Sequence, residues 1–481
     1  MSYVGYITTL KNVRKHPNAD RLQLGDCFGN TVCVSLDYYE GQVGLYLPTD
    51  GQVSTEFAQN NNLLRLRDEN GHSIAGGGYM DPKKRNVSAI RLRGEKSDGL
   101  FLPIKCLDYC FEDGNAANHL SVGDTIDVVN GHEICKKYIP PLPPEKIGNS
   151  RNGNKTRKHK VAIAPQFAEH VDTEQLAYNL DAFKPDDEIE ITLKMHGTSQ
   201  RTGYLPVLSG YWGSSIAIWL AKKERKWVPK KLYDWGWNNI KPLYNKYGYV
   251  SGTRRTVLND FEGGFYGSDK FREGHAKFFE GKLWIGEEVF YEVVGFTENG
   301  VPIMGDCANK KLNDKEFVKK YGETTRFSYG CHPNGWNNKD GGYNSGRNEP
   351  QSDIYVYRMT LTTPDGNVVE YTPDFMRYRC EQMGVKTVPV FDRFILHDYD
   401  LEMDDRTPGE IVKDIAEKYY DGPDPIGKTH IREGVVVRII NRPKFAAYKH
   451  KNFSFKCISG IIVNSMENNN SIDSEDILSE L

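Results

Sequence analysis

The first part of the chain alternates short apolar stretches with turn residues and shows no long helical period. Strand-like stretches occupy positions 3–10, 20–28, 31–35, 43–47, 89–93, 100–102 and 124–129. The polar segment 94–99 is expected to be a loop between two of them. Many short strands separated by turns are typical of a small β-barrel or sandwich. We therefore expect residues 1–137 to form an all-β domain.

The pattern changes after this domain. Residues 138–160 begin with the proline-rich sequence YIPPLPP and continue with polar, basic sequence, which predicts an extended linker. The linker is either simply solvated or lies with its basic end against phosphate. Residues 464–481 are rich in Asn, Ser, Glu and Asp, which predicts a flexible acidic tail.

Residues 161–463 combine strand and helix patterns, so an α+β domain is expected there. Apolar strands are predicted at positions 188–193, 284–294, 354–362, 434–440 and 453–459. Asp172 and Gln175 have the spacing of a capping box, which predicts a short helix through Ala182.

Composition narrows the class of protein. Hydrophobic residues make up 38% and charged residues 26%, as in globular proteins. A net charge of −3 requires any nucleic-acid-binding surface to be local. The nine cysteines lack the spacing of a zinc site or a disulfide framework, and no apolar run reaches the ~20 residues of a membrane span. These features predict a protein of an aqueous, reducing compartment, the cytoplasm or the nucleus, with no membrane partner.

Two segments of the first domain resemble a known binding module. HPNADRL at 16–22 resembles the entry of the OB-type tRNA-binding domains appended to synthetases, and RLRGEKSDGL at 91–100 is similar to a later strand pair of that family. OB barrels bind oligonucleotides on an open face, so Arg91 and Arg93 become candidate RNA contacts. A barrel that serves only as a scaffold remains the alternative.

Four charged residues stand at unusual places in the second domain. Lys194 follows a predicted strand and precedes Gly197, which lets backbone approach closely in the turn. Glu292, Glu433 and Lys456 each lie within or at the start of an apolar strand. Buried charges need partners, so these residues either pair for structural reasons or serve a reaction.

In this order, the four residues resemble the motifs of the covalent nucleotidyltransferase superfamily of ligases and capping enzymes. Lys194-x-His-Gly is similar to the nucleophile motif of nick-sealing RNA ligases, and Glu292 to the acidic strand motif. Glu433-Gly-Val-Val is similar to the E-G-x-V motif, and Lys456 to the closing lysine motif. The resemblance is to ATP-dependent RNA ligases with an N-terminal OB domain. It implies an OB-like β-barrel followed by an ATP-grasp-like nucleotidyltransferase domain of antiparallel sheets and helices.

The resemblance also implies a reaction. Lys194 would attack the α-phosphorus of ATP and carry AMP, and positive charge from Lys456 and a divalent metal would favour loss of its proton. Glu292 and Glu433 would hold Mg²⁺ or Mn²⁺ directly or through water. AMP would then pass to an RNA 5′-phosphate, and an RNA 3′-hydroxyl at a nick in a duplex would displace it. A monomer is expected.

Contacts to the nucleotide follow from the same resemblance. His196 and Gly197 belong to the nucleophile motif, and His196 is expected to orient through a ring nitrogen because it replaces the commoner Asp. Arg254 corresponds to the family's arginine element. Its neighbour Arg255 is the open alternative for that role and otherwise a candidate RNA contact.

Two further assignments stay open in the sequence. Tyr355 and Tyr357 share one face of a regular strand, so either could stack on adenine. Relatives often carry K-x-K in the last motif, but Lys456 has no second lysine at that spacing. Lys449 or Lys451 would then have to substitute in space.

Residues 205–250 look like an insertion between the nucleophile and Arg254. The insertion holds five tryptophans and many basic residues, and its candidate RNA contacts are Lys222, Lys223, Arg225 and Lys226. Such a mixture suits base stacking and phosphate contact. A small helical subdomain with its own tryptophan core explains the same residues equally well.

Two other functions compete with RNA ligation. A GTP-dependent capping-type guanylyltransferase shares the lysine chemistry but normally carries its OB domain after the catalytic one, whereas only the acidic tail follows Lys456 here. A non-catalytic OB-fold RNA-binding protein would explain residues 1–137 alone and would make the order of the four charged residues accidental.

Overall fold

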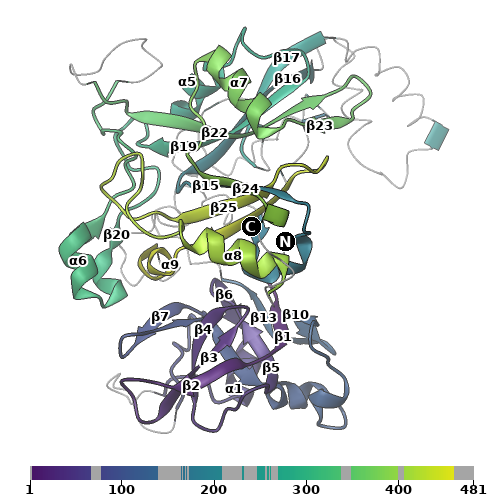
Figure 1. Cartoon of the computed structure of the whole chain (residues 1–481), viewed down its shortest axis with the longest axis vertical. Coiled ribbons are helices and arrows are strands. Elements are labelled where there is room, and N and C mark those ends of the chain that lie inside the picture. Colours follow the sequence, from purple (N-terminus) through teal and green to yellow (C-terminus); the bar gives the residue numbers. More distant parts are fainter. Residues whose placement is uncertain are drawn as a thin grey trace.

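The computed structural model describes residues 3–66, 77–138, 164, 166–167, 170, 173–207, 230–231, 246–254, 257–258, 261, 269–336, 348–398 and 406–459. Figure 1 shows two groups of elements, which we call the N-terminal part (3–138) and the C-terminal part (164–459). Most of the insertion expected at 205–250 lies outside the described residues.

The N-terminal part consists of short strands. They are β1 (Gly5–Thr9), β2 (Lys11–Lys15), β3 (Leu22–Cys27), β4 (Asn30–Ser35), β5 (Val43–Leu47), β6 (Gly51–Val53), β7 (Ala89–Leu92), β8 (Glu95–Asp98), β9 (Leu100–Pro103), β10 (Thr125–Ile126), β11 (Val128–Val129), β12 (His132–Glu133) and β13 (Cys135–Lys137). One helix, α1 (Thr55–Asn60), packs its buried Phe57 into the same core as Ile7 and Leu45.

The strands of this part form separate antiparallel sheets. Four strands are ordered β10-β1-β5-β9, three are ordered β2-β3-β4, and β6–β13, β7–β8 and β11–β12 are pairs. Within the described ranges these sheets do not close into a barrel. The expected OB-like barrel is therefore confirmed only as an assembly of short antiparallel strands. One physical reason is that the stretch 124–129 is split into β10 and β11, which pair with different neighbours.

Residues 94–99, expected as a loop, contain the second strand of a β-hairpin instead, β8. β7 and β8 pair antiparallel with Leu92 opposite Glu95. The two residues between them, Arg93 and Gly94, have φ angles of 47° and 95°, as a two-residue type I′ turn requires. The turn geometry, and not the polar composition, decides the local structure.

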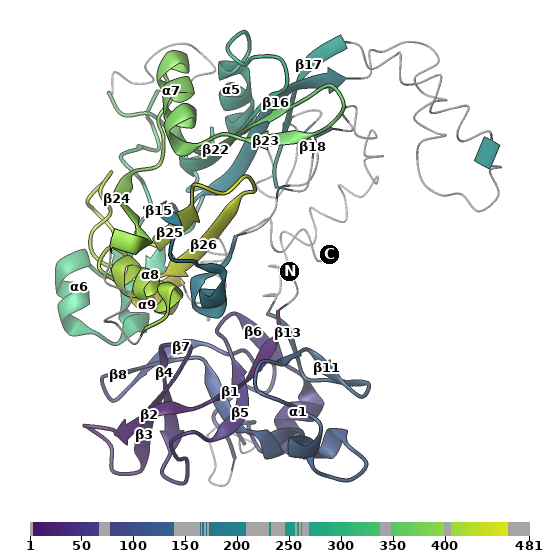
Figure 2. The ribbon, with the colours of Figure 1, turned by 45° about the vertical axis from the view of Figure 1, so that its right-hand side comes forward.

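The C-terminal part is built on two sheets, which confirms the predicted α+β class. The five-stranded sheet is ordered β14 (Glu174–Gln175), β26 (Ala446–Lys451), β25 (Gly434–Ile439), β15 (Glu188–Lys194) and β24 (Val390–Ile395). The six-stranded sheet is ordered β18 (Val257–Leu258), β17 (Lys246–Gly252), β16 (Thr198–Val207), β19 (Glu287–Gly295), β22 (Ser352–Thr362) and β23 (Val368–Glu370). In Figures 1 and 2 the five-stranded sheet lies between the N-terminal part and the six-stranded sheet.

Five described α-helices accompany these sheets. They are α5 (Lys270–Phe278), α6 (Lys315–Tyr321), α7 (Pro373–Met383), α8 (Pro408–Glu417) and α9 (Phe453–Ser459). Ile189 and Ile191 of β15 and Val435 of β25 share a core with Ile411 and Ile415 of α8. Because side chains alternate along a strand, the residues between these apolar positions lie on the opposite face of the sheet.

The helix predicted through Ala182 is absent. The chain forms the two-residue strand β14 and two 3₁₀ turns, Leu176–Tyr178 and Leu180–Ala182. β14 pairs with β26, so its backbone groups serve the sheet and are not available to a helix. Asp172, the expected cap, lies outside the described residues.

Residues 453–459, expected as a strand, form helix α9. Asn452 Oδ1 accepts a hydrogen bond from the backbone N–H of Ser454 at 2.7 Å, in the manner of an N-cap. Phe455 and Ile458 are fully or almost fully buried. A short apolar run cannot distinguish a strand from a buried helix by periodicity, and here the surrounding core selects the helix.

Helix α9 connects the two parts of the molecule. Lys456 Nζ lies 2.5 Å from Asp98 Oδ2 on β8. The thiol of Cys457 donates to the backbone oxygen of Ala89 at 3.4 Å, and the Phe453 ring lies 5.4 Å from the Lys96 ammonium. The β7–β8 hairpin of the N-terminal part and the last described helix are therefore in direct contact.

The cysteines and the described helices agree with two expectations from the sequence, namely reduced cysteines and no membrane-spanning helix. All nine cysteines are free thiols. Burial raises the pKa of Cys135 and of Cys307 to about 12, so these thiols are structural and not nucleophilic. No described helix is long and apolar enough to cross a membrane.

Candidate active site

A cavity lies between the two sheets of the C-terminal part. One side consists of three cross-strand pairs of β15 and β25, namely Lys194–Gly434, Thr192–Val436 and Glu190–Arg438. All of these except Gly434 line the cavity. Glu292 of β19 and Tyr357 of β22 line it from the other sheet. The arrangement follows from strand alternation, which places every second residue of β15 on the face opposite α8.

The amine of Lys194 is paired with a buried carboxylate. Lys194 Nζ lies 2.8 Å from Oε1 of Glu433, whose side chain is 3% exposed. Burial raises the pKa of Glu433, but the nearby charges, Lys194 foremost, hold it well below its ordinary value. His196 and Lys451 contribute to the same effect. Glu433 is therefore an anion that forms an ion pair with Lys194.

His196 lies next to the Lys194–Glu433 ion pair. Its backbone N–H donates to Tyr329 Oη at 2.7 Å, and its ring stands edge-on to Phe327 and Phe455. His196 Nδ1 lies 3.5 Å from Glu433 Oε2, which is longer than a normal hydrogen bond. His196 is 7% exposed and does not itself line the cavity.

Gly197 and Glu292 bring β19 to the site. A Cβ atom on Gly197 would lie 2.5 Å from the backbone oxygen of Val293, so only glycine lets the turn pass this strand. Glu292 lines the same cavity as Lys194. Within the described ranges, no group of three or more His, Cys, Asp or Glu side chains is arranged to hold a metal. Any metal here would need ligands from a bound molecule in addition to a carboxylate.

The structure separates the two candidate tyrosines. Tyr357 lines the cavity, and its hydroxyl lies 3.3 Å from Ser199 Oγ. Tyr355 is 5% exposed and packs in the core. Between Phe290 and Tyr291 of β19, the register with β22 shifts by one residue, as at a β-bulge. The regular alternation expected from the sequence is interrupted there, and only one of the two tyrosines reaches the cavity.

The predicted basic contacts have different surroundings. Arg254 lines the cavity. Arg91 lies 3.9 Å from Asp314 of the C-terminal part, so it serves the contact between the parts, whereas Arg93 is exposed at the tip of the β7–β8 hairpin. Arg255 lies outside the described residues. The same holds for the candidates of the insertion, Lys222, Lys223, Arg225 and Lys226.

Lys456 occupies a different place from the one expected. It lies on a helix and not in a strand, and its ammonium is engaged by Asp98 of the N-terminal part. It does not line the cavity beside Lys194 but a second cavity, between the two parts, together with Lys449 and Lys451. The helical turn after Asn452 is what carries its side chain toward β8.

Lys449 and Lys451 hold the strand position instead. Lys451 is opposite Gly434 on β25, and Gly434 is in turn opposite Lys194 on β15. Directly opposed residues point to the same face of a sheet, so Lys451 and Lys449, two residues apart, share the face of Lys194. Lys451 Nζ lies 3.6 Å from Glu433 Oε1. The K-x-K spacing of Lys449 and Lys451 is visible in the sequence.

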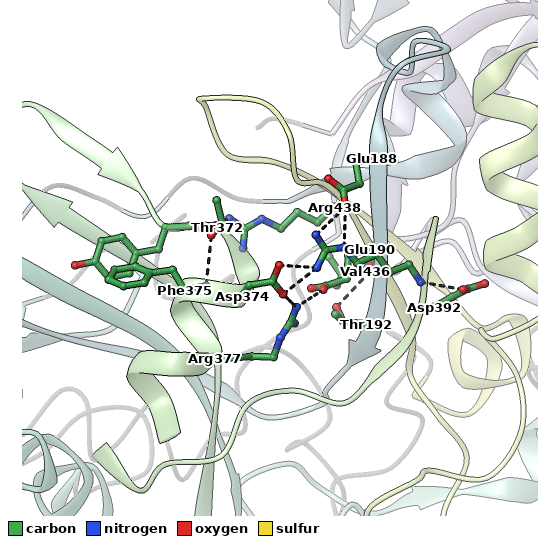
Figure 3. Close-up of polar contacts among 12 residues, drawn as sticks. Glu188, Glu190, Thr192, Thr372, Asp374, Phe375, Arg377, Asp392, Val436 and Arg438 are labelled. Atoms are coloured by element: carbon green, nitrogen blue, oxygen red, sulfur yellow. Dashed lines mark hydrogen bonds and ion pairs between the residues drawn. The ribbon is translucent and has the colours of Figure 1, made fainter. Parts of the chain in front are cut away.

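Sequence reasoning missed Glu190, Arg377 and Arg438, which also line the cavity. Glu190 precedes Lys194 by four residues in the same strand, so their shared face could have been read from the alternation. Arg377 belongs to α7, and no sequence spacing relates it to β15. Figure 3 shows Arg377 reaching Glu190, whose Oε2 accepts its hydrogen bond at 2.8 Å.

Comparisons with known proteins agree with this architecture. No protein-family model and no curated protein matches the chain. The structure of Naegleria gruberi RNA ligase with PPi is similar over 94% of this chain and 97% of that one, with a TM-score of 0.52 and 15% identity. A mutant of the same enzyme with ATP and Mn is similar over 94% and 98%, with a TM-score of 0.51 and 14% identity. A likeness at this identity shows the fold, and the resemblance predicted from the four motifs is confirmed at that level.

Proposed function

We propose that this chain, which has the fold of an RNA ligase, is an ATP-dependent RNA ligase that carries AMP on Lys194. The observation that carries the proposal is the position of the Lys194 amine, which lies in a cavity between two sheets and 2.8 Å from a buried carboxylate. A structural ion pair alone would not need to open into a cavity.

The first step uses the free amine of Lys194. Its Nζ attacks the α-phosphorus of ATP, a P–N bond forms, the bond to the bridging oxygen breaks, and pyrophosphate leaves while the amine loses a proton. Glu433 stays ionised because of its depressed pKa, so it positions the amine before attack. Lys451, on the same sheet face, supplies positive charge where negative charge develops.

The cavity lining suits the rest of the nucleotide. Tyr357 and Val436 come from opposite sheets and line the cavity on its two sides, as a base held between an aromatic ring and an apolar side chain requires. Arg254 lies in the same lining and offers donors to ribose or phosphate. His196 and Gly197 fix the turn that presents Lys194.

The donor set fits Mg²⁺ or Mn²⁺ held jointly with a substrate. Mg²⁺ is usually bound by one or two carboxylates together with phosphate oxygens and water, and Glu292 lines the same cavity as Lys194. Glu433 would contribute directly or through water. A bound divalent cation would supply charge stabilisation on the phosphates.

RNA would be joined in the two later steps. AMP passes from Lys194 to an RNA 5′-phosphate, which frees the amine, and an RNA 3′-hydroxyl then attacks that phosphate and releases AMP. We propose that residues 1–137 form the OB-like nucleic-acid-binding domain and 161–463 the ligase domain, with a nicked duplex as the substrate. The contact of Lys456 with Asp98 supports this, because it holds the N-terminal part beside the cavity lined by Lys449 and Lys451.

The test is transfer of α-labelled nucleotide to the purified chain with Mg²⁺, after removal of any preloaded AMP with pyrophosphate. We expect acid-stable label from ATP, none from GTP, and none in Lys194→Ala. Lys386→Ala is the matched control, because it removes an exposed lysine that pairs with Asp353. Label from GTP would indicate capping chemistry. A folded chain without label from either nucleotide would indicate an RNA-binding protein that is not an enzyme.

A second assay addresses the RNA. A nicked duplex with a 5′-phosphate and a 3′-hydroxyl should be sealed faster than the same strands without a complement. Equal rates on both substrates would contradict the nick as the preferred substrate while leaving the ligase chemistry intact.

A further inference from the structure

The cavity contains a second carboxylate that the proposed reaction does not use. Glu190 lies four residues before Lys194 on β15, and its side chain is 3% exposed. Four residues of extended strand separate the two Cα atoms by about 13 Å. Glu190 therefore stands at the far end of the cavity from the reactive amine, on the same side of the sheet.

Half of this carboxylate has a protein partner. Glu190 Oε2 accepts the hydrogen bond from Arg377, and Figure 3 shows the guanidinium approaching from α7. In the part of the chain that the structure describes, no donor hydrogen-bonds to Oε1. Because this oxygen is not fully buried and Glu190 lines the cavity, it is accessible to a donor from a bound molecule. A ligand that reaches this end of the cavity would meet this acceptor beside the guanidinium of Arg377 and near that of Arg438, which is opposite Glu190 on β25 and lines the same cavity.

The surroundings determine which group would arrive there. The Thr192–Val436 pair lies between the Lys194 and Glu190 pairs along the two strands, and Tyr357 lines the cavity from the other sheet. A base held beside Val436 and Tyr357, with its phosphate at Lys194, would direct an edge toward Glu190.

We infer that Glu190 selects adenine by accepting a hydrogen bond from its 6-amino group. Adenine presents this donor next to a ring-nitrogen acceptor, which matches an acceptor oxygen beside the Arg377 guanidinium. Guanine has a carbonyl oxygen at the same position. This acceptor would face the carboxylate oxygen of Glu190, and no hydrogen bond could form between them. The inference rests on the proposed function, because it takes the cavity to hold ATP, and it adds the residue that chooses the base.

Equilibrium binding tests this inference without catalysis. The full chain, freed of preloaded AMP, is titrated by calorimetry with AMP, with purine riboside monophosphate, which lacks the 6-amino group, and with IMP, which has a carbonyl there. We expect AMP to bind about ten- to a hundredfold more tightly than either analogue, as one hydrogen bond to a charged group implies.

Glu190→Gln should change the selectivity in a defined way. Arg377 would keep the amide oxygen and leave the amide NH₂ facing the cavity, so the preference for AMP over IMP should fall at least tenfold or reverse. Glu188→Gln is the matched control, because Glu188 begins the same strand, pairs with Arg393 and does not line the cavity. It should leave the ratio unchanged. The ratio of the AMP and IMP affinities is measured on one preparation of each variant. Partial misfolding would lower the number of binding sites but would not change this ratio.

The outcomes separate this inference from the proposed function. Equal affinities of the unmodified chain for AMP and purine riboside monophosphate, or an unchanged AMP-to-IMP ratio in Glu190→Gln, would overturn the role of Glu190. If label transfer from ATP occurs in that case, the ligase proposal still stands. Selective AMP binding without label transfer would leave Glu190 as the base-reading residue and remove the ligase proposal. No binding of any of the three nucleotides would overturn both.

Discussion

Lys456 Nζ lies 2.5 Å from Asp98 Oδ2, although the two residues are 358 positions apart in the chain. Their side chains are only 17% and 9% exposed. The last helix is thereby held against the β7–β8 hairpin of the N-terminal part, so the two parts are tied by a mostly buried ion pair. A lysine that resembles a catalytic motif in sequence has a structural partner in three dimensions.

Breaking this pair should destabilise the chain. We expect Lys456→Ala to lower the free energy of unfolding by about 1–3 kcal/mol, because Asp98 is left buried without its partner. Urea unfolding measures the change. Lys386→Ala removes an ion pair of the same 2.5 Å length on the surface and should cost less than about 1 kcal/mol. Equal effects of the two substitutions would mean that burial of the Lys456 pair adds nothing.

Lys451 and Lys456 should differ in label transfer. Lys451→Ala removes positive charge 3.6 Å from Glu433 and on the face of Lys194, so we expect transfer of AMP to fall by at least a hundredfold, about 2.7 kcal/mol. Lys456→Ala, assayed well below its unfolding temperature, should reduce it less than tenfold. A larger loss of AMP transfer in Lys456→Ala than in Lys451→Ala would instead support Lys456 as the lysine of the last motif.

Tyr357 and Tyr355 form a matched pair on one strand. Tyr357→Ala should raise the KM for ATP about tenfold while leaving stability within about 1 kcal/mol, because the ring lines the cavity. Tyr355→Ala should instead cost about 3–5 kcal/mol of stability, since it empties a core position that is 5% exposed. Thermal unfolding together with label transfer at varied ATP distinguishes the two. Similar KM values with similar losses of stability would contradict the separation.

His275 should make the chain sensitive to acid. It is 2% exposed, its Nε2 lies 2.8 Å from Ser352 Oγ, and burial lowers its pKa from 6.5 to about 4. Below pH 6.5 the unfolded chain takes up a proton that the folded chain does not, so stability is fully present above pH 6.5 and falls toward pH 4 by about 3 kcal/mol. His275→Gln cannot ionise and should lose less stability over this range, as measured by urea unfolding at a series of pH values. Parallel pH profiles of the two proteins would refute the prediction.

The sequence alone determined the features that depend on local periodicity and on ordered motifs. The strands that end at Lys194, contain Glu292 and follow Glu433 appear where runs of apolar, β-forming residues predicted them, because such residues favour a buried strand. The order of the motifs predicted the fold that the comparisons show. Local signals of this kind survive in any tertiary context that buries the same face.

Only the tertiary structure decided which side chains meet. At the register shift between β19 and β22, Tyr357 lines the cavity and Tyr355 packs in the core. The helix after Asn452 brings Lys456 to Asp98. Strand β26 brings Lys451 close to Glu433. Glu190 is hydrogen-bonded by Arg377, which lies on a helix 187 positions later in the sequence. Bulges, helix starts and long-range ion pairs depend on packing between elements. A single sequence carries no periodic signal for them. The set of side chains that line this cavity is therefore determined only when the two sheets are folded against each other.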